Sequence, residues 1–342
     1  RQQAQALIDG GVDLILIETC FDALNVKAAL AGILECRDAT SKSVTDRQTH
    51  IHPTIPVMIS VSVGDRSGRT LTGQTLEAFY TSVQHYPIVS FGLNCSLGAK
   101  ELMPLVEEIN RWCSCGVSCY PNAGLPNEMG GYDQTPEQMG DAVKVMAEKG
   151  LVNILGGCCG TSPAHIRAIA QAVKGIPARP LSSKYTNSVA SNLKHEQLAT
   201  KTVDFMANCS ENDGSARKKV DFMAKLQTRV LKVSGLEAVE VDVKKNNFTN
   251  VGERTNVAGS RKFARLIAAG EYDQAMQIAA KQIEDGATII DINMDDAMLD
   301  STREMERFVR CISNDPAVAK AALMIDSSHW ETILAGLKNA QG

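Results

Sequence analysis

Three cysteines of the chain stand directly after apolar runs that predict buried strands. Cys158 and Cys159 follow residues 151–155, and Cys95 follows residues 87–93. The carboxyl ends of parallel strands meet at one face of an α/β fold, so we expect the three thiols to lie together. Three thiolates form a zinc site whose fourth position is open. A substrate thiol in that position loses its proton and stays nucleophilic at neutral pH.

The other cysteines that invite a metal interpretation are predicted to be packing residues. Cys113, Cys115 and Cys119 have a Cys-x-Cys-x₃-Cys spacing, but the first two precede their strand. That places them at the opposite, stability face of the sheet. Cys20 follows a strand end and is also interpreted as packing. His165 is the nearest candidate for a fourth ligand, but it lies one turn into a helix and should point away.

Composition predicts a soluble globular protein with two or more domains. Of the 342 residues 44% are hydrophobic and 22% charged, and the net charge is −4. This charge argues against nucleic acid or an anionic membrane as a partner, and no apolar run is long enough to span a bilayer. Ten cysteines are too few for a disulfide scaffold and favour a reducing compartment, so we expect a cytoplasmic protein. Arg1 lies inside an expected helix, which suggests that the chain is cut from a longer one.

Strand and helix patterns alternate through residues 1–178. Expected strands cover 12–17, 56–63, 88–93, 116–120 and 152–155, and the intervening helices cover 23–35, 75–83, 101–110 and 136–149, with a last helix to 173. A polar loop is expected over 37–52. Short turns between alternating elements indicate parallel βα units. Five units are too few to close a (β/α)₈ barrel, so we interpret them as the last five of one.

A second series of βα units follows a linker over residues 179–227. A hairpin is expected over 229–243, then strands ending near 256, 292 and 325, with helices over 260–269, 272–285 and 302–313. The predicted fold class is therefore α/β, with two consecutive (β/α)₈ TIM-type barrels that are both incomplete in this chain. The first barrel part is residues 1–178, and the second is residues 228–342.

Polar residues stand at every strand end of the second series. The candidates for a shared binding site are Glu253, Asn256, Asp291, Asn293 and Asp326. Carboxylates and side-chain amides pair with the amide and amine edges of a bound ligand, and the cost of leaving buried polar groups unpaired makes such a site selective. The alternative is that such residues only cap the following helices. That alternative is preferred for Asp22, Asp295 and Asp296.

The motifs Gly-Leu-Asn-Cys95 and Gly-Gly-Cys158-Cys159-Gly-Thr resemble those of homocysteine-binding, zinc-dependent methyltransferases. The resemblance implies that Cys95, Cys158 and Cys159 are the zinc ligands. It also implies that Glu18 contacts the amino group of homocysteine. The Tyr-Pro-Asn122-Ala-Gly stretch implies backbone shaping and substrate contact by Asn122.

The stretches Gly-Glu253-Arg-Thr-Asn256, Asp291-Ile-Asn293-Met-Asp and Ile-Asp326-Ser-Ser resemble the pterin-binding barrels of methyltetrahydrofolate-dependent methyltransferases. Together the two parts resemble the cobalamin-dependent methionine synthases. This resemblance implies methyl transfer from 5-methyltetrahydrofolate through cobalamin to zinc-activated homocysteine, giving methionine and tetrahydrofolate. The partners are then homocysteine, 5-methyltetrahydrofolate and a cobalamin-binding domain of the same full-length protein.

Two other functions remain open at this point. The cobalamin-binding signature Asp-x-His-x-x-Gly is absent from this sequence, so we expect these residues to bind both substrates without turning over alone. A homocysteine S-methyltransferase that uses betaine or S-methylmethionine explains the three cysteines but leaves the second barrel unexplained. A non-catalytic zinc-binding protein needs a fourth protein ligand, for which the sequence offers no obvious residue.

Overall fold

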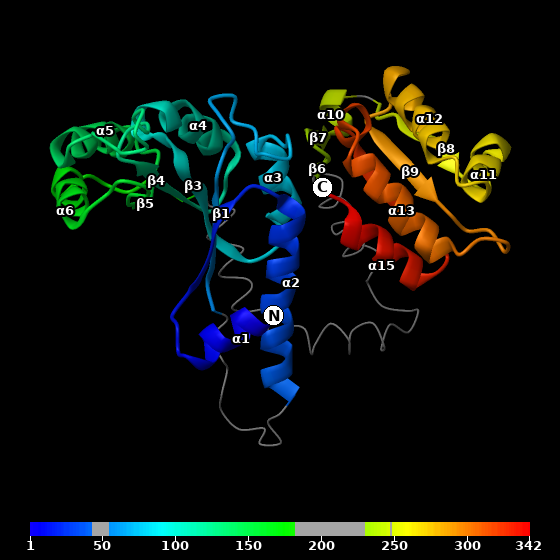
Figure 1. The fold of residues 1–342 in the computed structure, drawn as a ribbon, viewed down its shortest axis with the longest axis horizontal. Helices are drawn as coiled ribbons and strands as arrows, with labels where there is room; N and C mark the ends of the chain where they lie inside the picture. The colour runs from blue at the N-terminus through cyan, green and yellow to red at the C-terminus, as the bar shows by residue number, and fades with distance from the viewer. Residues whose placement is uncertain (43–54, 182–229, 247) are drawn as a thin grey trace, which may run out of the picture.

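The computed structural model describes residues 1–42, 55–181, 230–246 and 248–342. They form two α/β units of parallel strands and helices (Figure 1). The predicted linker lies outside the described residues except for 179–181, as does most of the predicted polar loop. Among the described residues, no helix is both long and apolar enough to cross a membrane.

The first unit has a five-stranded parallel sheet in the order β1-β2-β3-β4-β5. Its strands are β1 (Ile15–Cys20), β2 (Val57–Val61), β3 (Ile88–Gly98), β4 (Gly116–Asn122) and β5 (Ile154–Leu155). Its helices are α1 (Gln2–Asp9), α2 (Ala23–Lys42), α3 (Leu76–Val83), α4 (Ala99–Trp112), α5 (Pro136–Glu148) and α6 (Pro163–Ala172). Every residue of β2 is buried, as expected of a strand covered on both faces. The predicted alternation of strand and helix is confirmed.

Local capping explains where several of these helices begin. Thr135 and Gln138 form a capping box before α5, and Ser162 caps α6 ahead of Pro163. The Asp22 carboxylate accepts hydrogen bonds from the backbone N–H groups of Leu24 (2.8 Å) and Asn25 (3.3 Å) at the start of α2. The interpretation of Asp22 as a cap is therefore confirmed.

Two elements of the first unit are longer than predicted. Helix α2 runs to Lys42 rather than to Glu35, because residues 36–42 contain neither glycine nor proline and polarity alone does not end a helix. Strand β3 runs past Leu93 to Gly98, which pairs with Asn122 of β4. The register shifts between Asn94 and Gly98, so β3 has a bulge where Cys95 lies.

The second unit has a three-stranded parallel sheet in the order β10-β9-β8. Its strands are β8 (Val251–Asn256), β9 (Ile289–Asn293) and β10 (Ala322–Asp326), and its helices are α11 (Arg261–Ala268), α12 (Tyr272–Glu284), α13 (Ser301–Ser313), α14 (Pro316–Ala319) and α15 (Trp330–Asn339). Phe263 and Phe308 pack edge to face in its core, with ring centroids 5.1 Å apart. The four-residue helix α14 was not predicted, since one turn carries no periodicity. Neither described sheet closes, so both units are incomplete TIM-type barrels.

The predicted hairpin joins the two units. Strands β6 (Leu231–Ser234) and β7 (Ala238–Val241) pair antiparallel, and the short helix α10 (Val243–Asn246) follows. The carbonyl of Leu236, in the turn, accepts a hydrogen bond from Thr75 N–H (3.0 Å) before α3, and its N–H donates to the Ala319 carbonyl (2.8 Å) of α14. The turn therefore bonds to the backbone of both units.

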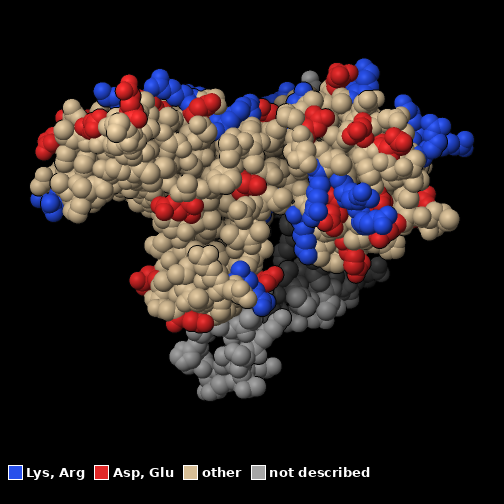
Figure 2. Space-filling view, in the orientation of Figure 1, with Lys and Arg blue, Asp and Glu red and all other residues tan. Residues whose placement is uncertain are grey.

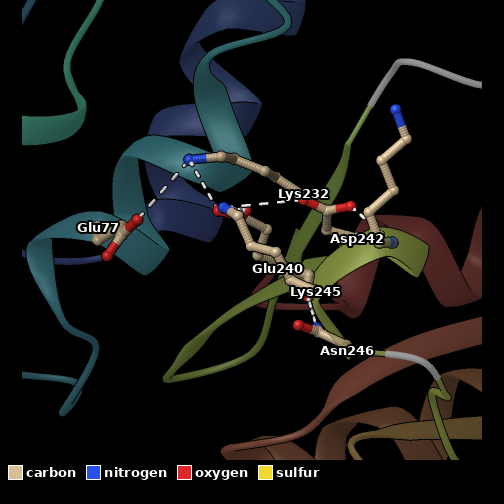
Figure 3. A network of polar contacts seen from close by, with 7 residues as sticks. Glu77, Lys232, Glu240, Asp242, Lys245 and Asn246 are labelled. Atoms are coloured by element: carbon tan, nitrogen blue, oxygen red, sulfur yellow. Dashed lines mark hydrogen bonds and ion pairs between the residues drawn. The ribbon is translucent and has the colours of Figure 1, made fainter.

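Charged side chains surround this joint. Lys232 of β6 lies 3.8 Å from both Glu77 of α3 and Glu240 of β7, and Lys245 of α10 lies 3.0 Å from Glu240 (Figure 3). These pairs are partly exposed, so each contributes little to stability. Figure 2 shows acidic and basic side chains interspersed over the visible face of both units.

Candidate functional site

The three predicted thiols lie together at the carboxyl ends of their strands. Cys95 comes from the bulge of β3, and Cys158 and Cys159 come from the turn between β5 and α6. Their sulfur atoms all lie within 4.8 Å of one another, and Cys95 Sγ is 3.5 Å from Cys159 Sγ. Among the described residues, this is the one group of three or more His, Cys, Asp or Glu side chains placed to hold a metal ion. Their role as metal ligands stays a prediction.

The backbone around the thiols is held in an unusual conformation. Thr19, Cys95 and Ser96 have φ angles of 57°, 61° and 60°, in the left-handed region that non-glycine residues rarely adopt. Each costs on the order of 1–3 kcal/mol and persists only because its surroundings hold it in place. A hydrogen bond between the Ser62 and Ser96 hydroxyls (2.8 Å) is one such restraint. Strain of this kind is typical of functional sites.

The turn that carries Cys158 and Cys159 is fixed to the end of β4. Cys158 N–H donates to the Pro121 carbonyl (2.8 Å), and Cys159 N–H donates to Asn122 Oδ1 (3.0 Å). Asn122 is 1% exposed. The predicted backbone-shaping role of Asn122 is therefore visible as a side-chain bond to the thiol turn. Its predicted contact with substrate stays a prediction.

The glycines of this turn make room for two tyrosines. A Cβ atom at Gly156 would lie 2.9 Å from the ring of Tyr120. Gly160 has a φ of 77°, and a Cβ atom there would lie 2.3 Å from Tyr132 Cβ. Burial, and then a hydrogen bond to Cys159, raise the pKa of the Tyr132 hydroxyl. Tyr132 therefore belongs to the site, although its position in the sequence gave no signal of this.

Cys95 and Cys158 differ in acidity. Burial alone would raise the pKa of Cys95, but the backbone N–H of Ser96 and the side chains of Cys159, Cys158 and Asn122 form hydrogen bonds that outweigh it. The pKa of Cys95 therefore lies below its usual value. Burial, with a further contribution from the neighbouring Cys95, raises the pKa of Cys158 to about 11. Without a cation, the site thus favours ionisation of Cys95 over Cys158.

The remaining candidates for metal ligation do not face the three thiols. The ring nitrogens of His165 are both engaged, with Nδ1 2.8 Å from Ser162 Oγ and Nε2 2.8 Å from the Gln134 carbonyl. His165 therefore points away, as predicted. Cys113 and Cys115 are buried before β4, and their carbonyls accept hydrogen bonds from Arg179 (2.6 and 2.9 Å).

The donor set fits zinc. Three sulfur ligands and no fourth His or Cys among the described residues match a catalytic site, which keeps one position for water or substrate. Cys20 does not contribute, since its thiol is buried and donates to the Ile17 carbonyl (3.3 Å). The interpretation of Cys20, Cys113 and Cys115 as packing residues agrees with this geometry.

Glu18 lies at the same end of the sheet. It is exposed in β1, next to Thr19, whose N–H donates to Asn94 Oδ1 (3.2 Å) beside Cys95. Glu18 therefore lies on the same strand end that bonds to Asn94, the residue before Cys95. Its contact with the amino group of the substrate stays a prediction.

The polar strand ends of the second unit also converge. Asn256 Nδ2 donates to Asp291 Oδ2 (3.4 Å), and Asn293 Nδ2 donates to Asp326 Oδ2 (2.7 Å). Burial raises the pKa of Asp291, and the neighbouring carboxylates of Asp326 and Glu253 raise it further. The five predicted pterin-binding residues therefore lie together at the carboxyl end of this sheet.

The acidic residues beyond β9 have structural partners. Asp296 accepts from Met298 N–H (2.8 Å) in a turn that precedes α13. Asp295 accepts from Ser327 Oγ and Ser328 N–H (both 2.6 Å), so it joins two strand-end loops. The cap of α13 is Asp300 instead. The prediction that Asp295 and Asp296 cap the following helix is therefore wrong.

Comparisons with known proteins identify both units. Residues 1–173 match the family model of homocysteine S-methyltransferase, which is half of the chain. The chain therefore belongs to the homocysteine S-methyltransferase family. Residues 252–342 match the family model of pterin binding enzymes, so the second unit is a pterin-binding domain.

Among solved structures, the chain is similar to the apo form of the homocysteine methyltransferase MmuM from Escherichia coli. The sequence identity is 21% and the TM-score is 0.33. The similarity covers 50% of this chain and 56% of that one, so the chain spans little more than half the length of this relative.

Proposed function

We propose that this chain binds homocysteine in its first unit and 5-methyltetrahydrofolate in its second, as part of a cobalamin-dependent methionine synthase. The overall reaction transfers the folate methyl group through cobalamin to homocysteine and yields methionine and tetrahydrofolate. The observation that carries the proposal is the group of three converging thiols in a chain that also has a pterin-binding domain.

Cys95, Cys158 and Cys159 would hold the zinc ion. Bound there, zinc supplies a Lewis acid that lowers the pKa of a substrate thiol to below neutral pH. Three cysteine ligands would leave one coordination position of the zinc for the homocysteine sulfur. Glu18 would pair with the homocysteine ammonium group. Asn122 keeps Cys159 in place through its backbone N–H.

In the second unit, the paired amides and carboxylates orient the pterin ring. Asp326 and Asp291 each accept one hydrogen bond from an asparagine, which leaves carboxylate lone pairs for the N–H groups of the pterin. The cobalamin belongs to another domain of the same full-length protein in this proposal. The described cysteines form no disulfide, which suits a reducing compartment, and we place the protein in the cytoplasm.

The two alternatives explain less of the molecule. A methyltransferase that takes its methyl group from betaine or S-methylmethionine needs only the first unit. It gives no role to the polar strand ends of the second unit. A purely structural zinc site requires a fourth protein ligand, and His165 has both nitrogens engaged elsewhere.

Calorimetric titration of the zinc-loaded full chain tests the first unit. Homocysteine should bind with release of about one proton at neutral pH, since its thiol is deprotonated on binding. The matched ligand 2-aminobutyrate, which lacks the thiol, should bind far more weakly and release none. Equal binding of both ligands would contradict the proposal.

Titration with 5-methyltetrahydrofolate tests the second unit. Asp326→Ala should weaken binding by about 1–3 kcal/mol, the cost of leaving polar groups unpaired. Asp315→Ala, which removes the cap of α14, is the control and should leave the affinity unchanged. Unchanged affinity in Asp326→Ala would remove this residue from the site.

A further inference from the structure

The side chain of Asn94, the residue before Cys95, makes four hydrogen bonds. It is 1% exposed. Its Oδ1 accepts from Ser60 Oγ (2.7 Å) and from Thr19 N–H (3.2 Å). Its Nδ2 donates to Thr19 Oγ1 (2.9 Å) and to Cys158 Sγ (3.8 Å). Two acceptor and two donor positions are the full capacity of a carboxamide, so the group is saturated.

The orientation of this carboxamide follows from its partners. A backbone N–H only donates, so the atom that faces Thr19 N must be the oxygen. The nitrogen then faces the Cys158 sulfur. The direction of the N–H···S bond is therefore set by the rest of the network.

The bonds of Asn94 join four parts of the sheet end. Ser60 belongs to β2, Thr19 to β1, Asn94 itself to β3, and Cys158 to the turn after β5. Thr19 is held in the left-handed conformation at this point, and its neighbour is Glu18. One side chain thus sets the position of a sulfur and of the strand end that carries the Glu18 carboxylate.

The N–H···S bond also has an electrostatic effect. Three thiolates on one divalent cation already carry a net negative charge, and a substrate thiolate adds to it. A donor aimed at a ligand sulfur withdraws charge from that sulfur, as hydrogen bonds to metal ligands generally do.

We propose that Asn94 is a positioning residue of the metal site, which orients the Cys158 sulfur and reduces its charge through the N–H···S bond. This inference rests on the proposed function, in which the three thiols hold a metal ion. Asn94 acts through Cys158 and Thr19 and is not itself a ligand.

Cobalt substitution of the full chain tests the inference without an activity assay. Asn94→Asp keeps the oxygen that accepts from Ser60 and Thr19 but replaces the donor to Cys158 by an acceptor. We expect the thiolate-to-cobalt charge-transfer band to move to longer wavelength, because the sulfur becomes richer in electrons. Metal affinity, measured by competition with a chelator, should fall about 10- to 100-fold. Asn94→Ser, whose hydroxyl is too short to reach the sulfur, should shift the band in the same direction.

Asn153→Asp is the matched control at the other end of the sheet. Asn153 Oδ1 accepts from Val117 N–H (2.9 Å), and its Nδ2 donates to the Arg179 carbonyl (2.8 Å). This substitution removes an equivalent structural donor far from the thiols. It should lower the thermal midpoint but leave the band and the affinity as in the wild type.

The outcomes separate the two claims. An unchanged band and an affinity within twofold of wild type in folded Asn94→Asp would overturn the role of Asn94. The same shifts in Asn153→Asp would also overturn it, because they would report general destabilisation. A wild-type chain with no thiolate-to-cobalt band would overturn the metal site itself and the inference with it.

Discussion

Replacement of Gly160 by alanine should damage the thiol site through Tyr132. Gly160 has a φ of 77°, and a Cβ atom there would lie 2.3 Å from Tyr132 Cβ and 2.5 Å from Tyr132 Cγ. These atoms lie close to the tyrosine backbone, so they do not move aside as the end of a flexible side chain does. The substitution must displace either Tyr132 or the turn that carries Cys159.

The cost has two parts that a control separates. A residue with a Cβ in the left-handed conformation costs about 1–2 kcal/mol. The overlap with Tyr132 adds about 1–3 kcal/mol, as overpacking generally does. Gly150 has a φ of 65° and no atom within 4 Å of its added Cβ. Gly150→Ala should therefore show the first cost alone.

Urea unfolding and zinc retention measure both effects in the full chain. Gly160→Ala should lower the free energy of unfolding by about 2–5 kcal/mol and reduce zinc retention, whereas Gly150→Ala should cost about 1–2 kcal/mol and retain zinc. Equal losses of stability in the two variants, with zinc retained in both, would refute the steric argument.

Two further predictions concern the second unit and the joint. Burial and the neighbouring Asp326 raise the pKa of Asp291, so the folded state binds more protons than the unfolded state, and stability falls as the pH rises through the pKa of Asp291. Asp291→Asn should flatten this fall in unfolding curves measured from pH 3 to 7. An unaltered pH profile of stability would contradict the prediction. A Cβ at Gly235 would lie 2.2 Å from the Ala321 carbonyl oxygen, so Gly235→Ala should destabilise the contact between the hairpin and the second unit by about 1–3 kcal/mol. Glu237→Ala removes only the ion pair with Arg69, whose two side chains are 44% and 46% exposed, so it should cost less than about 1 kcal/mol. A larger loss of stability in Glu237→Ala than in Gly235→Ala, measured by chemical unfolding, would contradict this account.

The order of strands and helices was predictable because their hydrophobic patterns are long and the turns between them short. Parallel pairing then places every strand's carboxyl end on one face, and this alone brings Cys95 to Cys158 and Cys159. The same argument gathers Asn256, Asn293 and Asp326, which occupy one register across β8, β9 and β10.

The details that shape the thiol site were not predictable in the same way. The bulge of β3 at Cys95 depends on the continued pairing of Gly98 with Asn122 in β4. The bonds of Asn94 reach Thr19, 75 residues earlier in the chain, and no local pattern encodes such a distance. Tyr132 reaches the site only because a loop after β4 returns over Gly160.

The zinc content of cysteine variants tests the central claim most directly. Atomic absorption of the purified full chain should find about one zinc per wild-type molecule, none in Cys158→Ala, and the wild-type amount in Cys113→Ala, whose thiol is buried at the other end of β4. X-ray absorption of the wild type should give zinc–sulfur distances of about 2.3 Å. Zinc retained in Cys158→Ala, or lost only in Cys113→Ala, would contradict the assignment of the three converging thiols as the metal site.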